Sequence, residues 1–222
     1  MGVILKNELD ALRRKLLSVG ALVEQNVDRA IVAIARRDEA LAKLIIDGDD
    51  EIDNKEVEVE EDCLKVLALH QPVATDLRIV IATLKINNDL ERVGDLASNI
   101  AHRAIYLAQK NPVPIPFDYD RMATVVRRML KESLDAFVTL DVSMARQVCE
   151  LDDEVDSTNR EMYNKVYYGI KSNPEMVEQL VHYLSVSRNL ERIGDYATNI
   201  AEDVIYMIDG KIVRHGKREG LF

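Results

Sequence analysis

The sequence predicts an all-α protein built as two tandem three-helix bundles, six long antiparallel helices related by internal duplication. The 222-residue chain contains only five Pro and nine Gly, and Ala, Leu, Ile, Val and charged residues dominate it, which is typical of helical proteins. Residues 89–101 recur as residues 189–201, with nine of the thirteen pairs identical. Apolar residues recur at helical spacing on both sides of one proline-rich segment.

The first repeat is expected to contain three helices. An apolar stripe predicts a helix over residues 6–37, after which Asp38 can act as the N-cap of a second helix over residues 38–69. The segment that includes Pro72 ends this helix, and a third is expected over residues 76–109.

The second repeat follows the same scheme. We expect a helix over residues 118–140, a second helix that Asp141 caps and Pro174 ends, and a last helix that runs to Asp209 and stops at Gly210. Short connections between long amphipathic helices make consecutive helices antiparallel neighbours, so each repeat should form a three-helix bundle.

The boundary between the repeats is expected at a segment with three prolines in five residues, which no helix can cross. The predicted organisation is a first three-helix unit at residues 1–110, a Pro-rich linker at 111–117, a second unit at 118–210 and a C-terminal tail at 211–222.

The composition restricts the class of partner. The net charge of -10 disfavours nucleic acid and anionic lipid unless basic residues are segregated, and no basic patch of useful size is visible along the sequence. Without an N-terminal targeting pattern or an apolar run of about 18 residues, a cytoplasmic protein is expected. Cys63 and Cys149 have no metal or redox spacing and are expected to be reduced thiols.

The duplicated segment carries acidic residues on one side of its helix. At about 100° per residue, Glu91, Asp95 and His102 fall within about 40° of one another, whereas Val93 and Ala97 face the opposite side. The corresponding residues of the second repeat are Glu191, Asp195 and Glu202. Polar surface positions tolerate substitution well, so charges kept in both copies indicate a function.

Each preceding helix carries a second acidic pair with the same i, i+4 spacing. These pairs are Asp49 with Asp53 and Asp152 with Asp156. Like charges at this spacing repel by a few tenths of a kcal/mol, a repulsion that a bound cation would remove. Carboxylates suit Mg, Mn, Ca and Fe, and Zn is also compatible. Ordinary solvent-facing charges with ion pairs from Arg92 explain the same pattern without a ligand.

Both copies of Leu-Glu-Arg-Ile/Val-Gly-Asp-x-Ala-x-Asn-Ile, the acidic segments upstream and the proline-rich linker together resemble the PhoU family of phosphate-uptake regulators over nearly the whole chain. The resemblance implies a cytoplasmic, non-enzymatic protein that represses the phosphate regulon when phosphate is ample. It also implies contacts with the phosphate ABC transporter ATPase subunit and the phosphate-responsive sensor histidine kinase. The protein would reach the membrane only through these partners, and the family suggests a homodimer.

The resemblance also implies a role for the acidic pairs, because family members hold metal ions at Glu/Asp-x-x-x-Asp pairs on the bundle surface. That motif maps onto Asp49 with Asp53, Glu91 with Asp95, Asp152 with Asp156, and Glu191 with Asp195. The repeats differ where His102 stands against Glu202, so their metal preferences can differ. The resemblance leaves the metal open among Fe, Zn, Mn, Ni and Mg.

Two other functions compete with this reading. A carboxylate-bridged metalloenzyme of the di-iron type needs Glu-x-x-His pairs, and none of the four histidines follows a Glu by three residues. A ligand-free structural or adaptor bundle remains open. Its docking surfaces would include the tyrosine-rich residues 163–168 and the arginines of the first helix, Arg13, Arg14, Arg36 and Arg37.

Overall fold

Long helices account for nearly all of the residues that the structure describes, as the apolar spacing predicts. The computed structural model describes residues 3–113 and 119–211, and these residues form seven α-helices and one short 3₁₀ turn. They are α1 (Val3–Arg36), α2 (Glu39–Asp47), α3 (Asp49–His70), α4 (Ala74–Ala108), α5 (Tyr119–Thr139), α6 (Val142–Ser172), η1 (Pro174–Met176) and α7 (Val177–Asp209). Most of the expected linker and nearly all of the expected tail lie outside the described residues.

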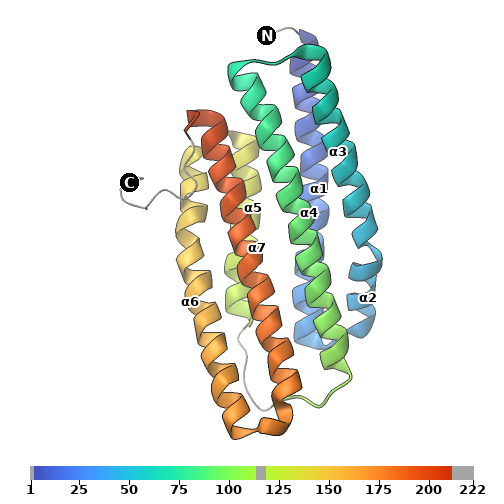
Figure 1. Cartoon of the computed structure of the whole chain (residues 1–222), viewed down its shortest axis with the longest axis vertical. Helices are drawn as coiled ribbons and strands as arrows, with labels where there is room; N and C mark the ends of the chain where they lie inside the picture. Colours follow the sequence, from blue (N-terminus) through green and yellow to red (C-terminus); the bar gives the residue numbers. More distant parts are fainter. Residues whose placement is uncertain (1–2, 114–118, 212–222) are drawn as a thin grey trace.

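The helices form two three-helix bundles that lie side by side (Figure 1). Helices α1, α2 with α3, and α4 make the first bundle, and α5, α6 and α7 make the second. The bundles meet where α4 packs antiparallel to α7 and where α1 packs against α5, with α3 and α6 at opposite edges. The predicted all-α fold of two tandem bundles is confirmed. No helix in the described ranges is both long and apolar enough to cross a membrane.

The second helix of the first repeat is interrupted, and our expectation of one unbroken helix there was wrong. Gly48 separates α2 from α3 with φ -89° and ψ -4°, and its N–H donates to the carbonyl of Ile46. Glycine lowers helix stability by about 1 kcal/mol relative to alanine. The three acidic residues that follow, Asp49, Asp50 and Glu51, form the first turn of α3, where the helix dipole favours negative charge.

The predicted helix caps are confirmed, and one type of turn occurs in both repeats. The carboxylate of Asp38 accepts a 2.9 Å hydrogen bond from the N–H of Leu41. Asp141 accepts bonds of 2.8 and 3.0 Å from the N–H groups of Ser143 and Met144. The residue before each cap is left-handed, with φ 57° in both repeats. The duplication therefore extends to the conformation of the connecting turns.

One continuous apolar core joins the two bundles. Buried side chains of α1 to α7 belong to a single cluster, and the core side of the repeat motif lies inside it. Val93, Ala97 and Ile100 each have 0% exposure, which confirms the side of α4 that was predicted to face the core. The acidic side of the motif is consequently turned away from the core.

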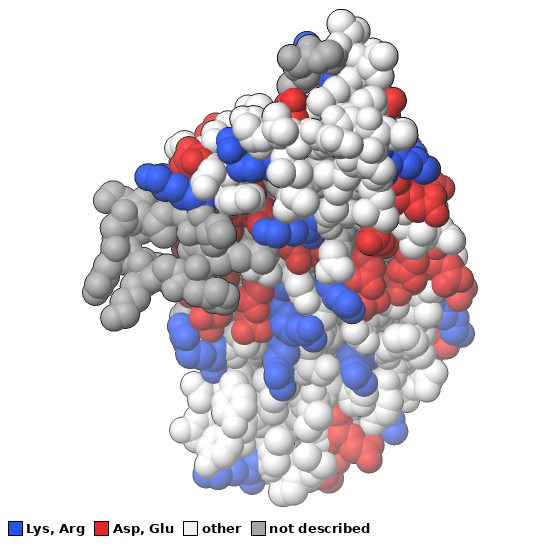
Figure 2. Space-filling view, turned by 45° about the horizontal axis from the view of Figure 1, so that its top comes forward, with Lys and Arg blue, Asp and Glu red and all other residues white. Residues whose placement is uncertain are grey.

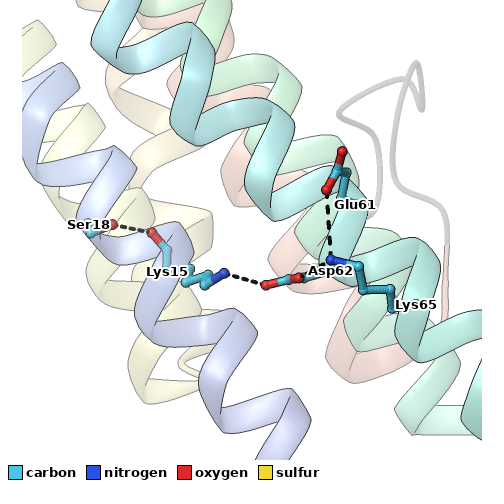
Figure 3. Close-up of polar contacts among 5 residues, drawn as sticks. All are labelled: Lys15, Ser18, Glu61, Asp62 and Lys65. Carbon is cyan, nitrogen blue, oxygen red and sulfur yellow. Dashed lines mark hydrogen bonds and ion pairs between the residues drawn. The ribbon is translucent and has the colours of Figure 1, made fainter.

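Polar contacts position α3 on α1 within the first bundle (Figure 3). Lys15 of α1 donates to the carboxylate of Asp62 on α3, and Lys65 lies 3.1 Å from the other oxygen of the same carboxylate. Glu61 lies 3.7 Å from Lys65. The hydrogen bond from Lys15 lowers the pKa of Asp62. Because α3 also carries the first acidic pair, this network helps to set where that pair lies.

A second set of polar contacts joins the two repeats. Lys85 Nζ of α4 lies 3.1 Å from Asp203 Oδ1 of α7, and Asp203 is almost completely buried. Arg78 lies two turns before Lys85 on α4, and its Nε donates a 3.0 Å hydrogen bond to the carbonyl of Met207, one turn after Asp203 on α7. These contacts fix the register of α4 against α7, and thus the placement of one repeat relative to the other.

Candidate functional site

Glycine at the centre of the repeat motif lets α3 approach α4 closely. A Cβ atom at Gly94 would lie 3.2 Å from Ile52 Cδ1 and 3.6 Å from Asp49 Oδ1. The carboxylate of Asp49 also forms a hydrogen bond with Ser98, one turn further along α4. The absence of a side chain at Gly94 thus brings the start of α3 onto the acidic side of α4.

The four acidic residues predicted for the first repeat face one another across α3 and α4. Burial raises the pKa of Asp49, and the charges of Asp53 and Asp95 raise it further. Burial likewise raises the pKa of Glu91, followed by the charge of Asp95, while Arg92 lowers it and Asp53 raises it again. The two pairs therefore form one electrostatic unit, which we call the first acidic cluster (Asp49, Asp53, Glu91 and Asp95).

The second repeat contains a matching second acidic cluster (Asp152, Asp156, Glu191 and Asp195) between α6 and α7. Burial raises the pKa of Glu191, followed by the charge of Asp156. Burial and then the charges of Glu191, Asp152 and Asp156 raise the pKa of Asp195 to about 6. Because α6 runs beside α7 as α3 runs beside α4, the duplicated sequence produces a duplicated arrangement of carboxylates.

Asp195→Asn should stabilise the ion-free protein at neutral pH. The pKa of Asp195 in the folded protein, about 6, lies above the ordinary value of an aspartate, so stability is lost as pH rises from about 4 through about 6. Asparagine removes that loss. Asp195 is partly exposed and its charge is screened, so we expect a Tm increase of only about 2–4 °C at pH 7.5. Thermal unfolding in chelator at pH 7.5 and pH 4 checks this.

The matched control is Asp95→Asn in the first repeat. Asp95 Oδ2 lies 3.6 Å from Arg92 Nη1, so its replacement removes an attraction together with the repulsion and should change Tm little. An Asp195→Asn variant that gains as much stability at pH 4 as at pH 7.5 would contradict the proposed electrostatic origin.

Arginine pairs with the first acidic cluster, as the ligand-free alternative predicts. Arg92 Nε lies 3.3 Å from Glu91 Oε2, and its Nη1 lies 3.6 Å from Asp95. Even so, Glu91 Oε2 is buried and accepts no hydrogen bond. Arg92 is half-exposed, so these ion pairs are weak and leave an acceptor atom of the cluster unsatisfied.

His102 and Glu202 lie further along their helices than the clusters. His102 is exposed on α4, seven residues after Asp95, a rise of about 10.5 Å along the axis. Glu202 is half-buried in the corresponding part of α7. The structure thus brings the eight Asp and Glu residues of the acidic pairs together as two clusters and leaves these two residues at the margins.

The donor chemistry of both clusters fits a hard cation. Each offers four carboxylates, so all ligand atoms would be oxygens, and in the first cluster one of these oxygens, Glu91 Oε2, has no hydrogen-bond partner. Within residues 3–113 and 119–211, no three His, Cys, Asp or Glu side chains already converge closely enough to hold a metal ion. Binding would therefore require rotation of the exposed carboxylates.

Sequence reasoning missed two residues that act on the first cluster. Ser98 donates to Asp49 from α4, and Glu56 of α3 raises the pKa of Glu91. The substitution of Ser98 by Thr198 between the repeats preserves a hydroxyl group and could have identified the first. The position of Glu56, one turn beyond Asp53, was the only signal for the second.

Comparison with known proteins accounts for both repeats. A family model described as the PhoU domain matches residues 16–104 and again residues 119–204. The phosphate-specific transport system accessory protein PhoU homolog of Pseudomonas aeruginosa is 37% identical over 94% of this chain and 86% of its own length. The homolog from Clostridium acetobutylicum is 37% identical over 95% of this chain and 96% of its own length.

A solved structure shows the same fold. The crystal structure of PhoU from Pseudomonas aeruginosa superposes with a TM-score of 0.90 at 36% identity, covering 93% of this chain and 99% of that one. Since this similarity spans both bundles, the arrangement of the repeats is shared together with the fold of each.

Proposed function

Since the chain belongs to the PhoU family, we propose that it is a cytoplasmic accessory protein of a phosphate-specific transport system and represses the phosphate regulon when phosphate is ample. Its mechanism is contact with the transporter ATPase subunit and with the phosphate-responsive sensor histidine kinase, and it acts as a homodimer. The observation that supports this proposal most strongly is the similarity to an accessory protein of such a system over 94% of this chain, which includes both duplicated helices. Those relatives are named as accessory proteins, which supports a non-enzymatic role.

The regulatory role is tested in the host organism. Deletion of the gene should raise expression of a reporter driven by a phosphate-starvation promoter in phosphate-rich medium, and the wild-type gene should restore repression. Pull-down with the purified protein should capture the transporter ATPase and the cytoplasmic region of the kinase. Binding to neither protein, with normal repression in the deletion strain, would contradict the proposal.

Metal ions bound at the two acidic clusters would serve the regulatory role as cofactors or as structural support. We propose that Asp49, Asp53, Glu91 and Asp95 hold an ion in the first repeat and that their counterparts in the second hold another, while His102 and Glu202 would be ligands of a further ion at the margin of each cluster. A bound cation would offset both the burial and the mutual repulsion that raise the pKa values of Asp49 and Asp195. Oxygen-only donor sets favour Mg, Mn and Fe, while His102 would admit Zn or Ni in the first repeat.

Glu91→Ala combined with Asp95→Ala should abolish ion binding in the first repeat alone. Equilibrium dialysis against Fe, Zn, Mn, Ni and Mg, followed by elemental analysis, should show about half the wild-type stoichiometry if the sites are independent. The matched variant is Glu191→Ala with Asp195→Ala, which should remove the other half. No bound ion in the wild type at micromolar concentration would reject the metal proposal and leave the regulatory role untouched.

A ligand-free adaptor is the second candidate, and the Arg92 ion pairs favour it, because they partly neutralise the first cluster without a metal. The exposed side chains of Tyr163, Tyr167 and Tyr168 would then be a docking surface. Tyrosine is enriched in protein interfaces, so exposure of three on one helix is consistent with this role. If chelator-treated protein captures its partners as well as untreated protein does, this candidate is favoured over the metal-dependent one.

A further inference from the structure

Basic side chains gather along the junction of α4 and α7, although the protein as a whole carries a net charge of -10. Figure 2 shows Lys and Arg side chains along the middle of one face, with acidic areas to either side. We define the basic seam as Arg78, Lys85, Arg92, Arg103 and Lys110 from α4 and its C-terminal end, with Arg188 and Arg192 from α7.

Helical spacing places these residues on one side of α4. Arg78, Lys85 and Arg92 follow one another at intervals of seven residues, or two turns, and Arg103 and Lys110 continue the stripe. Arg78 and Lys85 contact α7 directly, through Met207 and Asp203. The stripe therefore runs beside the contact between the two repeats.

The basic side chains of α7 lie beside the same contact between α4 and α7. Arg192 precedes Asp203 by eleven residues, about three turns, so both lie on nearly the same side of α7. Since Asp203 meets Lys85 of α4, Arg192 is also directed toward the seam, and Arg188 lies one turn before it. Two segments that are about 100 residues apart in the sequence thus contribute to one positive surface.

Part of this positive charge is not held in ion pairs within the protein, although the charges of Arg188 and Arg192 do partly offset the rise that burial causes in the pKa of Glu191. Among the described residues, no carboxylate oxygen lies within 4 Å of a side-chain nitrogen of Arg103, Arg188 or Arg192. Arg103 Nε is also buried without a hydrogen-bond partner.

A histidine at one end of the seam responds to the local charge. His182 stacks on Tyr106 with ring centroids 3.7 Å apart. Burial lowers the pKa of His182, the charges of Arg103 and Lys110 lower it further, and Glu178 opposes them. The net lowering of the His182 pKa is consistent with a positive surface at this position.

The acidic clusters on both sides limit the shape of the partner. The first cluster borders α4 at Glu91 and Asp95, and the second borders α7 at Glu191 and Asp195. Packed helices are about 8–10 Å apart, so the seam is about one helix wide. A nucleic acid duplex or an anionic bilayer would extend over both acidic clusters, whereas a single polypeptide helix fits between them.

We propose that the basic seam binds an acidic helical segment of a partner protein. Carboxylates one turn apart on that segment, about 6 Å along its axis, match the spacing of Arg188 and Arg192. The inference rests on the proposed adaptor function and adds to it the docking surface and the chemistry of the partner. Complementary charge at such a surface increases the association rate and selects against basic partners.

Binding can be measured with a defined probe, a fluorescein-labelled helical Glu/Ala peptide of about 25 residues, a length of about 37 Å. Fluorescence anisotropy at low salt should show binding that weakens as ionic strength rises. A neutral Gln/Ala peptide of the same length should not bind. Arg188→Gln combined with Arg192→Gln should raise Kd about fivefold, since each exposed charge contributes modestly.

The matched control is Arg29→Gln with Arg36→Gln on α1, which removes the same charge from exposed positions outside the seam. It should change Kd less than about twofold, within the small effect of distant charges. Equal weakening by both variants, or tighter binding of duplex DNA or of anionic vesicles than of the acidic peptide, would overturn the proposal. If the transporter ATPase and the kinase bind wild type and the Arg188→Gln/Arg192→Gln variant equally well, the adaptor function stands and the seam is rejected.

Discussion

Lys85→Ala should destabilise the protein by about 2–4 kcal/mol, because it leaves a buried carboxylate without its charged partner. Lys85 Nζ lies 3.1 Å from Asp203 Oδ1, and the Asp203 side chain is 2% exposed. The expected loss is at the lower end of the range for buried pairs, since the Lys85 side chain is 41% exposed. Urea unfolding followed by circular dichroism at pH 7.5 measures the change.

The double variant Lys85→Ala with Asp203→Asn separates the ion pair from general packing effects. Replacing the buried charge should restore a large part of the stability lost in Lys85→Ala, giving a coupling free energy of about 1–3 kcal/mol. Additive losses in the double variant would show that water or another side chain already compensates Asp203. The same variants report on how strongly the two repeats hold together, because the pair joins α4 to α7.

Ile52→Ala should cost about 2–5 kcal/mol, since it opens a cavity where α3 meets α4. Ile52 is 1% exposed, and its Cδ1 would lie only 3.2 Å from a Cβ atom at Gly94, so nothing on α4 can fill the space. Any compensating shift of α3 would also move Asp49 away from Ser98. Chemical denaturation measures the loss of stability. Ion binding at the first acidic cluster reports whether Asp49 has moved away from Ser98.

Ile52→Val supplies the graded control and should cost only about 0.5–1.5 kcal/mol, since one methylene group is removed. Val155 occupies the equivalent place in the second repeat, 1% exposed and 3.5 Å from a Cβ atom at Gly194. Val155→Ala should weaken ion binding in the second repeat alone. If Ile52→Ala weakens both repeats equally, the two clusters are not positioned independently.

The ends of the helices could be predicted from the sequence where a single residue determines them. Asp38 and Asp141 cap helices through their own carboxylates, and Gly210 adopts the left-handed conformation that ends α7. The break at Gly48 could not be predicted in this way. Ala42, Ile45 and Ile52 are all buried and keep helical spacing across it, so the apolar pattern continues although the backbone does not.

The acidic clusters were predictable in composition because i, i+4 spacing fixes the side of a helix and short turns fix which helices are neighbours. The hydrogen bond from Ser98 to Asp49 could not be predicted, because it depends on the register of α3 against α4. That register follows from Ile52 packing on Gly94, a contact between residues that no periodicity relates. The basic seam was missed for a similar reason, since Arg92 and Arg192 are separated by a whole repeat.

The long-range contacts between α4 and α7 determine an order of assembly during synthesis. Arg78 and Met207 are 129 residues apart, so at about 5–20 residues per second α4 waits about 6–26 s for its partner helix. Contacts within each repeat span much shorter loops and form sooner. We therefore expect the first bundle to fold as α4 leaves the ribosome, with Arg78 and Lys85 keeping its unpaired side hydrated and resistant to aggregation until α7 arrives.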